Sequence, residues 1–383
     1  MSGVVDRLYL LLLGVRARAR ERRRWAEPLS RSALPRVFYG KDQLPGRSEV
    51  AGGGIVKCQD LTSTFPNTPD SPNILYLVSS ALPVQAAHMG RLARKAGAAL
   101  VLNQNGVVYP AWHGPGWQRE NRPMRDVLME ADHVFYQSEF CRMAADRFLG
   151  KKRGSWEVLY NPVDTGFFTP ADFRPPPGQS PILLCAGTHH SFYRVQVAIE
   201  ALALVAKELP QARLALAGRF KWHPSESVSL GEVRQCAGRM GVGHAVDIQG
   251  PYTQEQAPAM FRQAHVLLHT KYADPCPRVV VEAMACGLPV AYSATGGVPE
   301  LVGEQAGEGV PGPVDWERDH PPSAAEMAAA VLRILGSHER YSAAARGRAV
   351  ARFDVVPWIR RHEAVFEKLL GGESARGRAP DLL

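Results

Sequence analysis

Short runs of apolar residues alternate along this chain with longer, amphipathic stretches. In the first half the runs predict strands at 36–39, 74–79, 99–104, 133–138 and 157–161. In the second half they predict strands at 182–187, 212–218, 245–250, 265–270 and 289–293. The stretches between them predict helices, most clearly at 55–62, 195–209, 324–336 and 356–370. Apolar strands separated by helices are typical of parallel sheets with crossover connections.

Three short polar signals mark where helices begin. Thr253-x-x-Gln256 and Ser323-x-x-Glu326 have the spacing of capping boxes, in which two side chains satisfy the free N–H groups of a first helical turn. Ser138 follows a strand and is a good N-cap residue. These signals place three helix starts directly after predicted loops or strands.

The 383 residues are too many for one ordinary core and suit two domains of roughly 150–190 residues. A Pro-rich break at 170–181 interrupts the alternation of strands and helices, which then restarts. We therefore expect two α/β domains, and the predicted divisions are an arm at 1–35, a first domain at 36–165, a second domain at 166–355, a helix at 356–370 that packs on the first domain, and a disordered tail at 371–383.

The six cysteines are irregularly spaced and include no Cys-x-x-Cys pair. A disulfide framework or a zinc ribbon would need paired or regularly spaced cysteines. The pattern favours a reducing compartment and therefore a cytoplasmic protein.

The net charge of +8 is concentrated at the N-terminus. Residues 1–36 hold nine Arg and three acidic residues, which gives 9 − 3 = +6 and leaves about +2 for the rest of the chain. A nucleic-acid partner would require basic residues across a folded face. We therefore predict no nucleic-acid partner.

The arm also contains the apolar run 8–15, LYLLLLGV, followed by arginines. The run is far shorter than the ~20 residues that span a bilayer, and a secretory signal would have its positive charge before the apolar run. Two interpretations remain open. Residues 1–24 contact the inner face of a membrane peripherally, with the arginines on anionic headgroups, or they form a helix docked on the protein body or a frayed tail.

The most informative segment is 274–300, DPCPRVVVEAMACGLPVAYSATGGVPE. It predicts a loop, a helix of small residues, a short strand and a Gly-Gly turn, with Asp274 and Glu282 eight positions apart and Glu300 at the end. This order of elements is that of a ligand site at the edge of a parallel sheet. A helix N-terminus attracts anions and the acids accept hydrogen bonds from hydroxyl groups. Together they suit a nucleotide-linked sugar.

Several segments, spread over roughly residues 36–370, resemble the family 4 retaining glycosyltransferases of glycosyl transferases group 1. They are the Gly-rich turn 52–54 and the segments 161–170, 182–218, 247–270 and 274–300. The resemblance implies the α/β GT-B fold, in which two Rossmann-like domains face each other across a cleft. It also implies a hexosyltransferase-type enzyme.

The resemblance assigns catalytic roles to four residues. Glu282 corresponds to the acid that holds the donor ribose, and Asp274 takes the place of a Glu that contacts the transferred sugar. The family has an Arg and a Lys on the leaving diphosphate where this chain has Thr188 and Tyr193. We expect Arg194 and Arg219 to replace that pair, because a cation on a leaving phosphate lowers the barrier by several kcal/mol.

Further contacts are expected on both sides of the reaction. On the donor side they are Gly187, Thr188, Tyr252, Cys276, Arg278, Val279, Gly296, Gly297 and Glu300. On the acceptor side they are Gly53, Gly54, Asn103, Asn105, Trp112 and His113. Pro275 and Pro277 have no N–H to donate. We expect no metal and no cofactor, because the adjacent His189 and His190 lack a neighbouring carboxylate and resemble ordinary loop residues.

The predicted function is a retaining, metal-independent glycosyltransferase that moves a sugar from a nucleoside-diphosphate donor to a glycan or lipid-linked acceptor. Two alternatives stay open: a catalytically weak partner protein that binds a sugar nucleotide or glycan, and a sugar-nucleotide epimerase of the same fold. No GxSxG and no Walker phosphate loop occurs, so hydrolase and kinase functions are disfavoured. A dehydrogenase is disfavoured because the turn after 182–187 lacks GxGxxG.

Overall fold

The computed structural model describes residues 15, 18–26, 34–46, 49, 53–172, 178 and 180–371. The chain forms two compact units. Unit 1 contains the described residues up to Gly46, those from Gly53 to Leu159 and those from Val356 onward, and unit 2 extends from Tyr160 to Val355. The chain therefore passes from unit 1 into the main part of unit 2 between residues 159 and 160. The sequence analysis placed this domain boundary between residues 165 and 166. The reason is that the Val163 N–H donates to the Phe353 carbonyl at 2.8 Å, which ties this segment to unit 2.

Unit 1 is built on a five-stranded sheet whose strands are all parallel. They are β1 (Val37–Phe38), β2 (Ile74–Val78), β3 (Ala99–Gln104), β4 (His133–Tyr136) and β5 (Ser155–Val158), in that order across the sheet. The strand predicted at 157–161 begins two residues earlier and ends three residues earlier, at Val158. Its ladder begins earlier because Ser155 pairs with His133 and Trp156 with Val134.

The helices of unit 1 follow from this strand order. They are α2 (Gly53–Thr62), α3 (Ala86–Lys95), α4 (Pro110–His113), α5 (Trp117–Glu130) and α6 (Glu139–Phe148). Each strand from β2 onward adds on the same side of the one before it, so right-handed crossovers put α3, α5 and α6 on one face. At the start of α6, the Ser138 Oγ accepts from the Cys141 N–H at 2.9 Å, which confirms the predicted N-cap.

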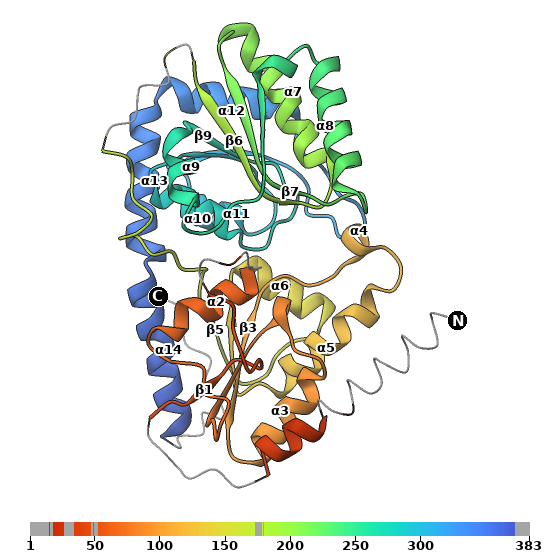
Figure 1. The fold of residues 1–383 in the computed structure, drawn as a ribbon, viewed down its shortest axis with the longest axis vertical. Helices are drawn as coiled ribbons and strands as arrows, with labels where there is room; N and C mark the ends of the chain where they lie inside the picture. The colour runs from red at the N-terminus through yellow and green to blue at the C-terminus, as the bar shows by residue number, and fades with distance from the viewer. Residues whose placement is uncertain are drawn as a thin grey trace. The chain divides into compact units, whose positions relative to one another are not determined.

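The other face of the unit 1 sheet is covered by α14 (Val355–Leu370), which Figure 1 shows along one side of the strands. Its His362 is fully buried, and the His362 Nε2 lies 3.0 Å from the Tyr76 hydroxyl. The His362 ring also lies 4.3 Å from Phe135, while Phe366 lies 5.1 Å from Phe65. The C-terminal helix thus supplies the second layer of the unit 1 core.

We expect His362 to make the stability of the protein depend on pH. Burial lowers its pKa to about 3; the Trp358 carbonyl and Glu157 oppose this shift, whereas His133 and Arg361 add to it. Because the unfolded chain takes up this proton near pH 6.5 and the folded chain does not, the contribution is complete above about 6.5 and is lost as the pH falls toward 3. Between pH 6.5 and 5 the loss is about 2 kcal/mol.

Urea unfolding at pH 7 and pH 5 measures this effect. His362→Gln removes the titrating group, so its free energy of unfolding should fall less between the two pH values than that of the wild type. Equal losses in the two proteins would show that His362 does not titrate on unfolding.

Unit 2 contains a six-stranded parallel sheet. Its strands are β6 (Ile182–His189), β7 (Arg213–Phe220), β8 (Val246–Gln249), β9 (Val266–His269), β10 (Val290–Ser293) and β11 (Gly307–Val310). The order across the sheet is β11-β10-β9-β6-β7-β8. The chain therefore builds one half of the sheet outward from β6 and the other half outward from β9.

This reversal places helices on both faces of the unit 2 sheet. Right-handed crossovers put α7 (Phe192–Glu208) and α8 (Glu226–Arg239) on one face, and α10 (Arg278–Ala285) and α11 (Val298–Val302) on the other, as Figure 1 shows. The remaining helices are α9 (Ala257–Gln263), α12 (Ala324–Gly336) and α13 (His338–Phe353). A core of alternate strand residues, among them Leu183, Leu214 and Leu268, packs with Ile199 and Val331 of α7 and α12.

The predicted capping boxes are present in unit 2. The Thr253 N–H donates to the Gln256 Oε1 at 2.9 Å, and the Gln256 N–H donates to the Thr253 Oγ1 at 3.3 Å. The Ser323 Oγ accepts from the Glu326 N–H at 3.4 Å at the start of α12. Ser323 is the N-cap residue of α12, as predicted, whereas the Thr253–Gln256 box holds the turn directly before α9, whose N-cap residue is Gln256.

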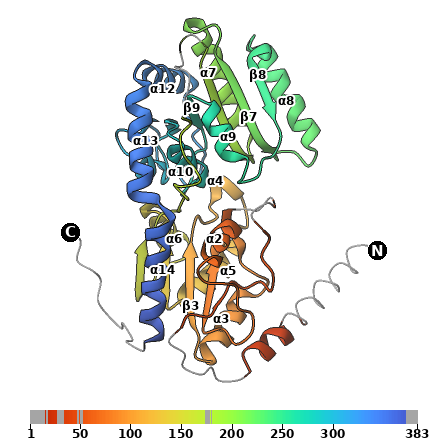
Figure 2. The same ribbon diagram turned by 60° about the vertical axis from the view of Figure 1, so that its left-hand side comes forward.

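The described end of the N-terminal arm docks on unit 1. Residues 18–24 are helical and lie beside α3 (Figure 2), where the Arg18 Nε donates to the Gln85 Oε1 at 2.5 Å. Trp25 is buried, and the Arg24 guanidinium lies 4.0 Å from the centre of the Phe38 ring. This is the docked-helix interpretation for these residues. The apolar run at 8–14 lies outside the described residues, and no described helix is long and apolar enough to cross a membrane.

Candidate functional site

The candidate site lies at the carboxyl ends of β6 and β9, the neighbouring strands from which the two halves of the unit 2 sheet diverge. Ligands of open parallel sheets bind where the strand order reverses in this way, because the connections leaving the two strands run to opposite faces and open a crevice. Here Thr188 and His189 belong to β6, followed by His190, and Lys271 and Asp274 follow β9. The pairing of β6 with β9 therefore brings basic residues and an acid to the same edge of the sheet.

Two glycines leave the carboxyl-end edge of the sheet free of side chains at neighbouring positions on β6 and β7. Gly187 and Gly218 are paired in register on β6 and β7, both with positive φ. A Cβ on Gly218 would lie 1.9 Å from the Gly187 carbonyl oxygen, so no side chain fits there. The Gly218 N–H donates to the Gly250 carbonyl at 3.1 Å, which extends this backbone surface to the end of β8.

Asp274 is buried and lies beside a lysine and a histidine. Its Oδ2 lies 3.2 Å from the Lys271 Nζ and 3.2 Å from the His269 Nε2. Burial by itself raises the pKa of Asp274, but Lys271, His269 and Arg194 together outweigh burial and hold that pKa well below its usual range. Asp274 is therefore a carboxylate at neutral pH.

Glu282 lies one turn into α10 and is also buried. Its Oε1 accepts from the Arg278 Nε at 2.7 Å and from the Gln254 Nε2 at 3.4 Å. Burial and the charge of Glu282 both raise the pKa of the nearby Tyr252. Arg278, expected above as a donor-side contact, is the ion-pair partner of Glu282 in this structure, and its contact with the donor stays a prediction. Glu282, Tyr252 and Gln254 form a second polar group at the edge of the sheet.

The loop before α10 is held in place by backbone contacts. The Asn161 Nδ2 donates to the Cys276 carbonyl at 2.6 Å, and the Gly297 N–H donates to the Asp274 carbonyl at 2.9 Å. A Cβ on Gly296 would lie 2.4 Å from the Asp274 carbonyl oxygen. Gly296 thus permits close packing of two loops. Val279 lies in the first turn of α10, where the helix N-terminus presents N–H groups.

Glu300 lies in α11 and interacts at the boundary of unit 2. Its Oε2 accepts from the Tyr160 hydroxyl at 3.2 Å, and its carbonyl accepts from the Arg348 Nη2 at 2.8 Å. These contacts connect Glu300 to structural neighbours, so a role in binding substrate hydroxyls stays a prediction.

The two arginines expected to replace the family's cations differ in their surroundings. Arg194 is buried, its Nη1 donates to the Thr188 carbonyl at 2.6 Å, and its buried Nε has no hydrogen-bond partner. Arg219 pairs in register with Thr188 and is partly exposed. His189 was wrongly expected in a loop: it belongs to β6, its ring stacks on Phe220 at 5.2 Å, and burial lowers its pKa to about 3.

The acceptor-side candidates belong to unit 1. Gly53 and Gly54 begin α2, and a Cβ on Gly54 would lie 2.7 Å from the Ser80 Oγ, so this glycine serves close packing. The Asn103 Oδ1 accepts from the Gln137 Nε2 at 2.6 Å. The side chain of Asn105 pairs with Ser79. Both amides are thus engaged within the unit.

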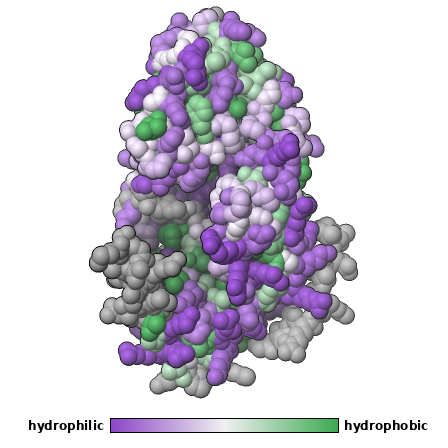
Figure 3. Space-filling view, turned by 90° about the vertical axis from the view of Figure 1, so that its right-hand side faces the viewer, coloured by the Kyte–Doolittle hydropathy of each residue, from purple (hydrophilic) through white to green (hydrophobic). Residues whose placement is uncertain are grey.

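Trp112 and His113 remain accessible on the short helix α4, where Trp112 is 53% exposed. On the face drawn in Figure 3, hydrophilic residues predominate and apolar ones are scattered among the coloured atoms. An exposed indole can stack on a sugar ring. The acceptor contacts of this pair stay predictions.

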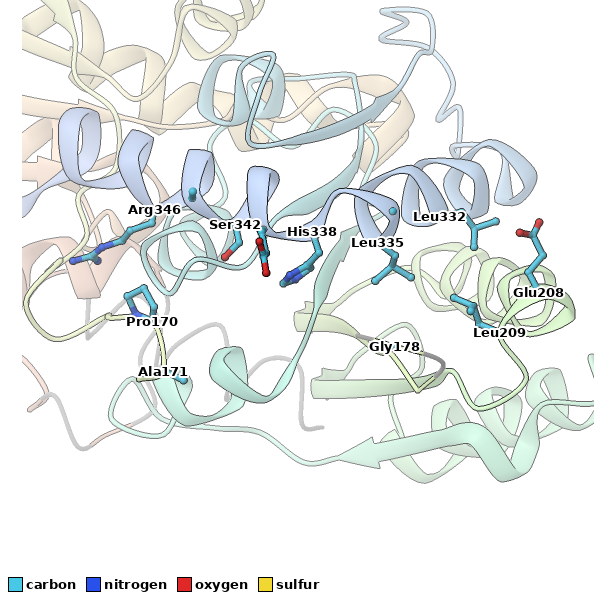
Figure 4. Close-up of a pocket in the computed structure, with 13 residues that line it drawn as sticks. Pro170, Ala171, Gly178, Glu208, Leu209, Leu332, Leu335, His338, Ser342 and Arg346 are labelled. Atoms are coloured by element: carbon cyan, nitrogen blue, oxygen red, sulfur yellow. The ribbon is translucent and has the colours of Figure 1, made fainter. Parts of the chain in front are cut away.

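A hollow of about 910 Å³ in unit 2 lies away from these residues. Figure 4 shows it between the end of α7 and the adjoining parts of α12 and α13, lined by Leu209, Leu335 and Ser342. The Ser342 Oγ donates to the Gly287 carbonyl, and the Arg346 Nη1 donates to the Ala285 carbonyl. Because β6 starts near this hollow and ends at the candidate site, the two lie at opposite ends of the strand.

Among the described residues, no three His, Cys, Asp or Glu side chains gather as a metal site. In the candidate site the acids Asp274 and Glu282 contact basic side chains and, for Glu282, the amide of Gln254.

Sequence reasoning missed Lys271, His269 and Gln254. Lys271 and His269 surround Asp274, and Gln254 contacts Glu282. The available signal was position: Lys271 and His269 flank the end of the predicted strand 265–270, directly before the Asp274 loop. Their distances to the acids could not be obtained from spacing alone.

Comparison with known proteins agrees with this geometry. Residues 171–346 match the model of the family described as glycosyl transferases group 1. This part of the chain is therefore similar to the glycosyl transferases group 1 family. The predicted resemblance is thereby confirmed at the level of group 1, while family 4 stays a prediction.

Curated relatives match less than half of the chain. The D-inositol 3-phosphate glycosyltransferase of Streptomyces avermitilis is 31% identical over 162 residues, which cover 40% of this chain and 35% of that protein. The enzyme of the same name from Mycolicibacterium smegmatis is 28% identical over 47% of this chain and 42% of that protein. The chain thus spans about a third to two fifths of the length of the curated relatives it matches.

Solved structures match most of the fold. Anabaena Alr3699/HepE in complex with UDP-glucose has a TM-score of 0.63 at 22% identity, covering 82% of each chain. Sucrose-phosphate synthase of Thermosynechococcus elongatus has a TM-score of 0.62 at 19% identity, covering 83% of this chain and 77% of that one. The predicted α/β GT-B fold is confirmed.

Proposed function

We propose that this protein is a glycosyltransferase that takes a sugar from a nucleoside-diphosphate donor and transfers it to a hydroxyl acceptor. One observation carries the proposal: two buried carboxylates, Asp274 and Glu282, flank the first turn of α10 beside the point where β6 and β9 diverge. Cations at the same edge suit a diphosphate, and the carboxylates suit the hydroxyl groups of a ribose and a sugar.

The relatives support the same substrate class. Their printed names include an inositol phosphate glycosyltransferase, and the structures similar to this chain include complexes with UDP and UDP-glucose. In our proposal Glu282 holds the ribose of the donor and Asp274 orients the transferred sugar. The donor base and the sugar are left to experiment.

We further propose a retaining, metal-independent reaction. The bond between the sugar C1 and the diphosphate oxygen breaks, and a bond between C1 and the acceptor oxygen forms on the same face of the ring. The proton of the acceptor hydroxyl passes to the leaving phosphate oxygen. The contribution of the protein is to hold the acceptor hydroxyl on the face of the sugar that the phosphate leaves, and to place positive charge near the leaving group, where it lowers the barrier.

A glycan or lipid-linked acceptor is proposed on the basis of the N-terminal arm. Arg22 and Arg23 remain exposed on the docked 18–24 helix, and exposed cations near an apolar segment favour anionic membrane surfaces. Peripheral contact through residues 1–24 would bring such an acceptor close to the enzyme.

A panel of nucleotide sugars tests the proposal by thermal unfolding. A ligand that binds only the folded protein adds about 2.7 kcal/mol of stability at a concentration of 100 times its Kd. One donor class should raise the melting temperature by several degrees, and free monosaccharides should not. The proposal fails if none of the UDP-, GDP-, ADP-, CDP- and dTDP-sugars changes the melting temperature.

A second function, donor binding without turnover, is favoured by one specific observation. Arg194 is buried and already donates to the Thr188 carbonyl. These contacts make it less able to move toward a leaving diphosphate and stabilise its charge. Donor hydrolysis in the absence of acceptor distinguishes the two functions. An active enzyme releases free sugar slowly, whereas a binding protein shows the thermal shift and no release.

A further inference from the structure

Basic residues follow the carboxyl ends of β6, β7 and β9. Burial and the charges of Arg194, Lys271 and Lys221 together lower the pKa of His190. His190 follows β6, Lys221 follows β7 and Lys271 follows β9, so the three strands nearest the strand reversal each contribute a basic residue. A concentration of positive charge at this edge is a feature of an anion site.

Of these cations, Lys271 combines access with flexibility. Arg194 is 6% exposed and its Nη1 is bonded to the Thr188 carbonyl at 2.6 Å. The Lys271 side chain is 30% exposed, and its ammonium group lies 3.2 Å from the Asp274 Oδ2. A lysine has a flexible four-carbon stem, so its ammonium can move to a new acceptor without backbone movement.

The residues on both sides of Lys271 are held by hydrogen bonds. The Thr270 hydroxyl donates to the Arg194 carbonyl at 2.7 Å, and the Tyr272 N–H donates to the Tyr193 hydroxyl at 3.0 Å. The Tyr272 hydroxyl in turn accepts from the Asp315 N–H at 2.7 Å. Both neighbours of Lys271 are therefore anchored, which fixes the point from which its side chain starts.

Asp274 keeps other partners if Lys271 moves away. Its Oδ2 also lies 3.2 Å from the His269 Nε2, and the charge of Arg194 acts on it as well. Asp319 is a second acid near Lys271, and burial raises its pKa, which disfavours its charged form. A diphosphate carries more negative charge than either carboxylate, so it competes well for the ammonium group.

We propose that Lys271 exchanges Asp274 for the diphosphate of the bound donor, and that it is the mobile cation of this site. The inference rests on the proposed function, because it presumes a nucleoside-diphosphate ligand. On binding, the exchange neutralises the phosphates and releases Asp274 to accept from a hydroxyl group of the transferred sugar. The Lys271–Asp274 ion pair thus keeps both residues ready in the unliganded protein.

Isothermal titration tests this with UDP, GDP, ADP, CDP and dTDP, each compared with its nucleoside. Lys271→Met removes the charge and keeps much of the stem. It should raise the Kd of the diphosphate that the wild type binds by at least about 10-fold and leave the Kd of the matching nucleoside unchanged. Lys271→Arg should retain most of the diphosphate affinity. Lys207→Met, at the exposed far end of α7, is the matched charge control and should bind as the wild type does.

The outcomes separate the two claims. If the wild type binds one diphosphate and Lys271→Met binds it equally well, the role of Lys271 is wrong and the proposed function stands. Equal weakening of diphosphate and nucleoside would also overturn the inference, because it indicates a merely structural role. If the wild type binds none of the five diphosphates, both claims fail. Lys271→Gln, which can still donate to Asp274, gives the same comparison should Lys271→Met fail to fold.

Discussion

Replacing Glu282 with glutamine should weaken donor binding by about 10- to 100-fold. A hydrogen bond to a charged group contributes roughly 1.5–3 kcal/mol, and the amide of glutamine has one acceptor oxygen where the carboxylate has two. The substitution also removes the charge that the Arg278 Nε contacts at 2.7 Å. Titration of the donor selected by thermal unfolding gives the Kd, and turnover gives kcat/KM, which should fall by a similar factor.

Glu339→Gln is the matched control, because Glu339 is an exposed acid in the first turn of α13. It should bind and turn over the donor as the wild type does. Unchanged donor affinity in Glu282→Gln would remove Glu282 from the binding site and with it the proposed ribose contact.

Replacing Gly218 with alanine should destabilise unit 2 by more than about 3 kcal/mol and abolish donor binding. The φ of Gly218 is +117°, which L side chains rarely adopt, and the added Cβ would lie 1.9 Å from the Gly187 carbonyl oxygen. That contact is with backbone, so relief requires β6 and β7 to separate at the edge where the candidate site lies. Urea unfolding and donor titration measure the two effects.

Gly231→Ala provides a control with the opposite sign. Gly231 lies inside α8, where a Cβ would meet no atom within 4 Å, so alanine should stabilise that helix by about 0.5–1 kcal/mol. Equal stability of Gly218→Ala and Gly231→Ala would contradict the close approach of β6 and β7 at this glycine pair.

The fold was largely accessible from the sequence because apolar runs and capping residues are local signals. The run 182–187 predicted β6, and Thr253 and Gln256 predicted the start of the next helix. The unit boundary was missed because it depends on a long-range contact. The bond of Val163 to Phe353 assigns residues 160–165 to unit 2, and nothing near Val163 in the sequence indicates this partner.

The candidate site was only partly accessible for a related reason. The positions of Asp274 and Glu282 could be chosen from the motif, but their partners come from other loops. Lys271 and Gln254 reach the two acids only after the strands are paired, so spacing along the chain does not predict them. For Arg194, charge suggested a phosphate contact, whereas burial and the bond to the Thr188 carbonyl became apparent only in three dimensions.

A crystal structure of the protein with the nucleoside diphosphate selected by titration tests the central claim most directly. We predict that the ribose hydroxyls lie about 3 Å from the Glu282 carboxylate, with the diphosphate at the carboxyl ends of β6 and β9. A nucleotide seated instead in the hollow beside α12 and α13, or a ribose away from Glu282, would contradict the account.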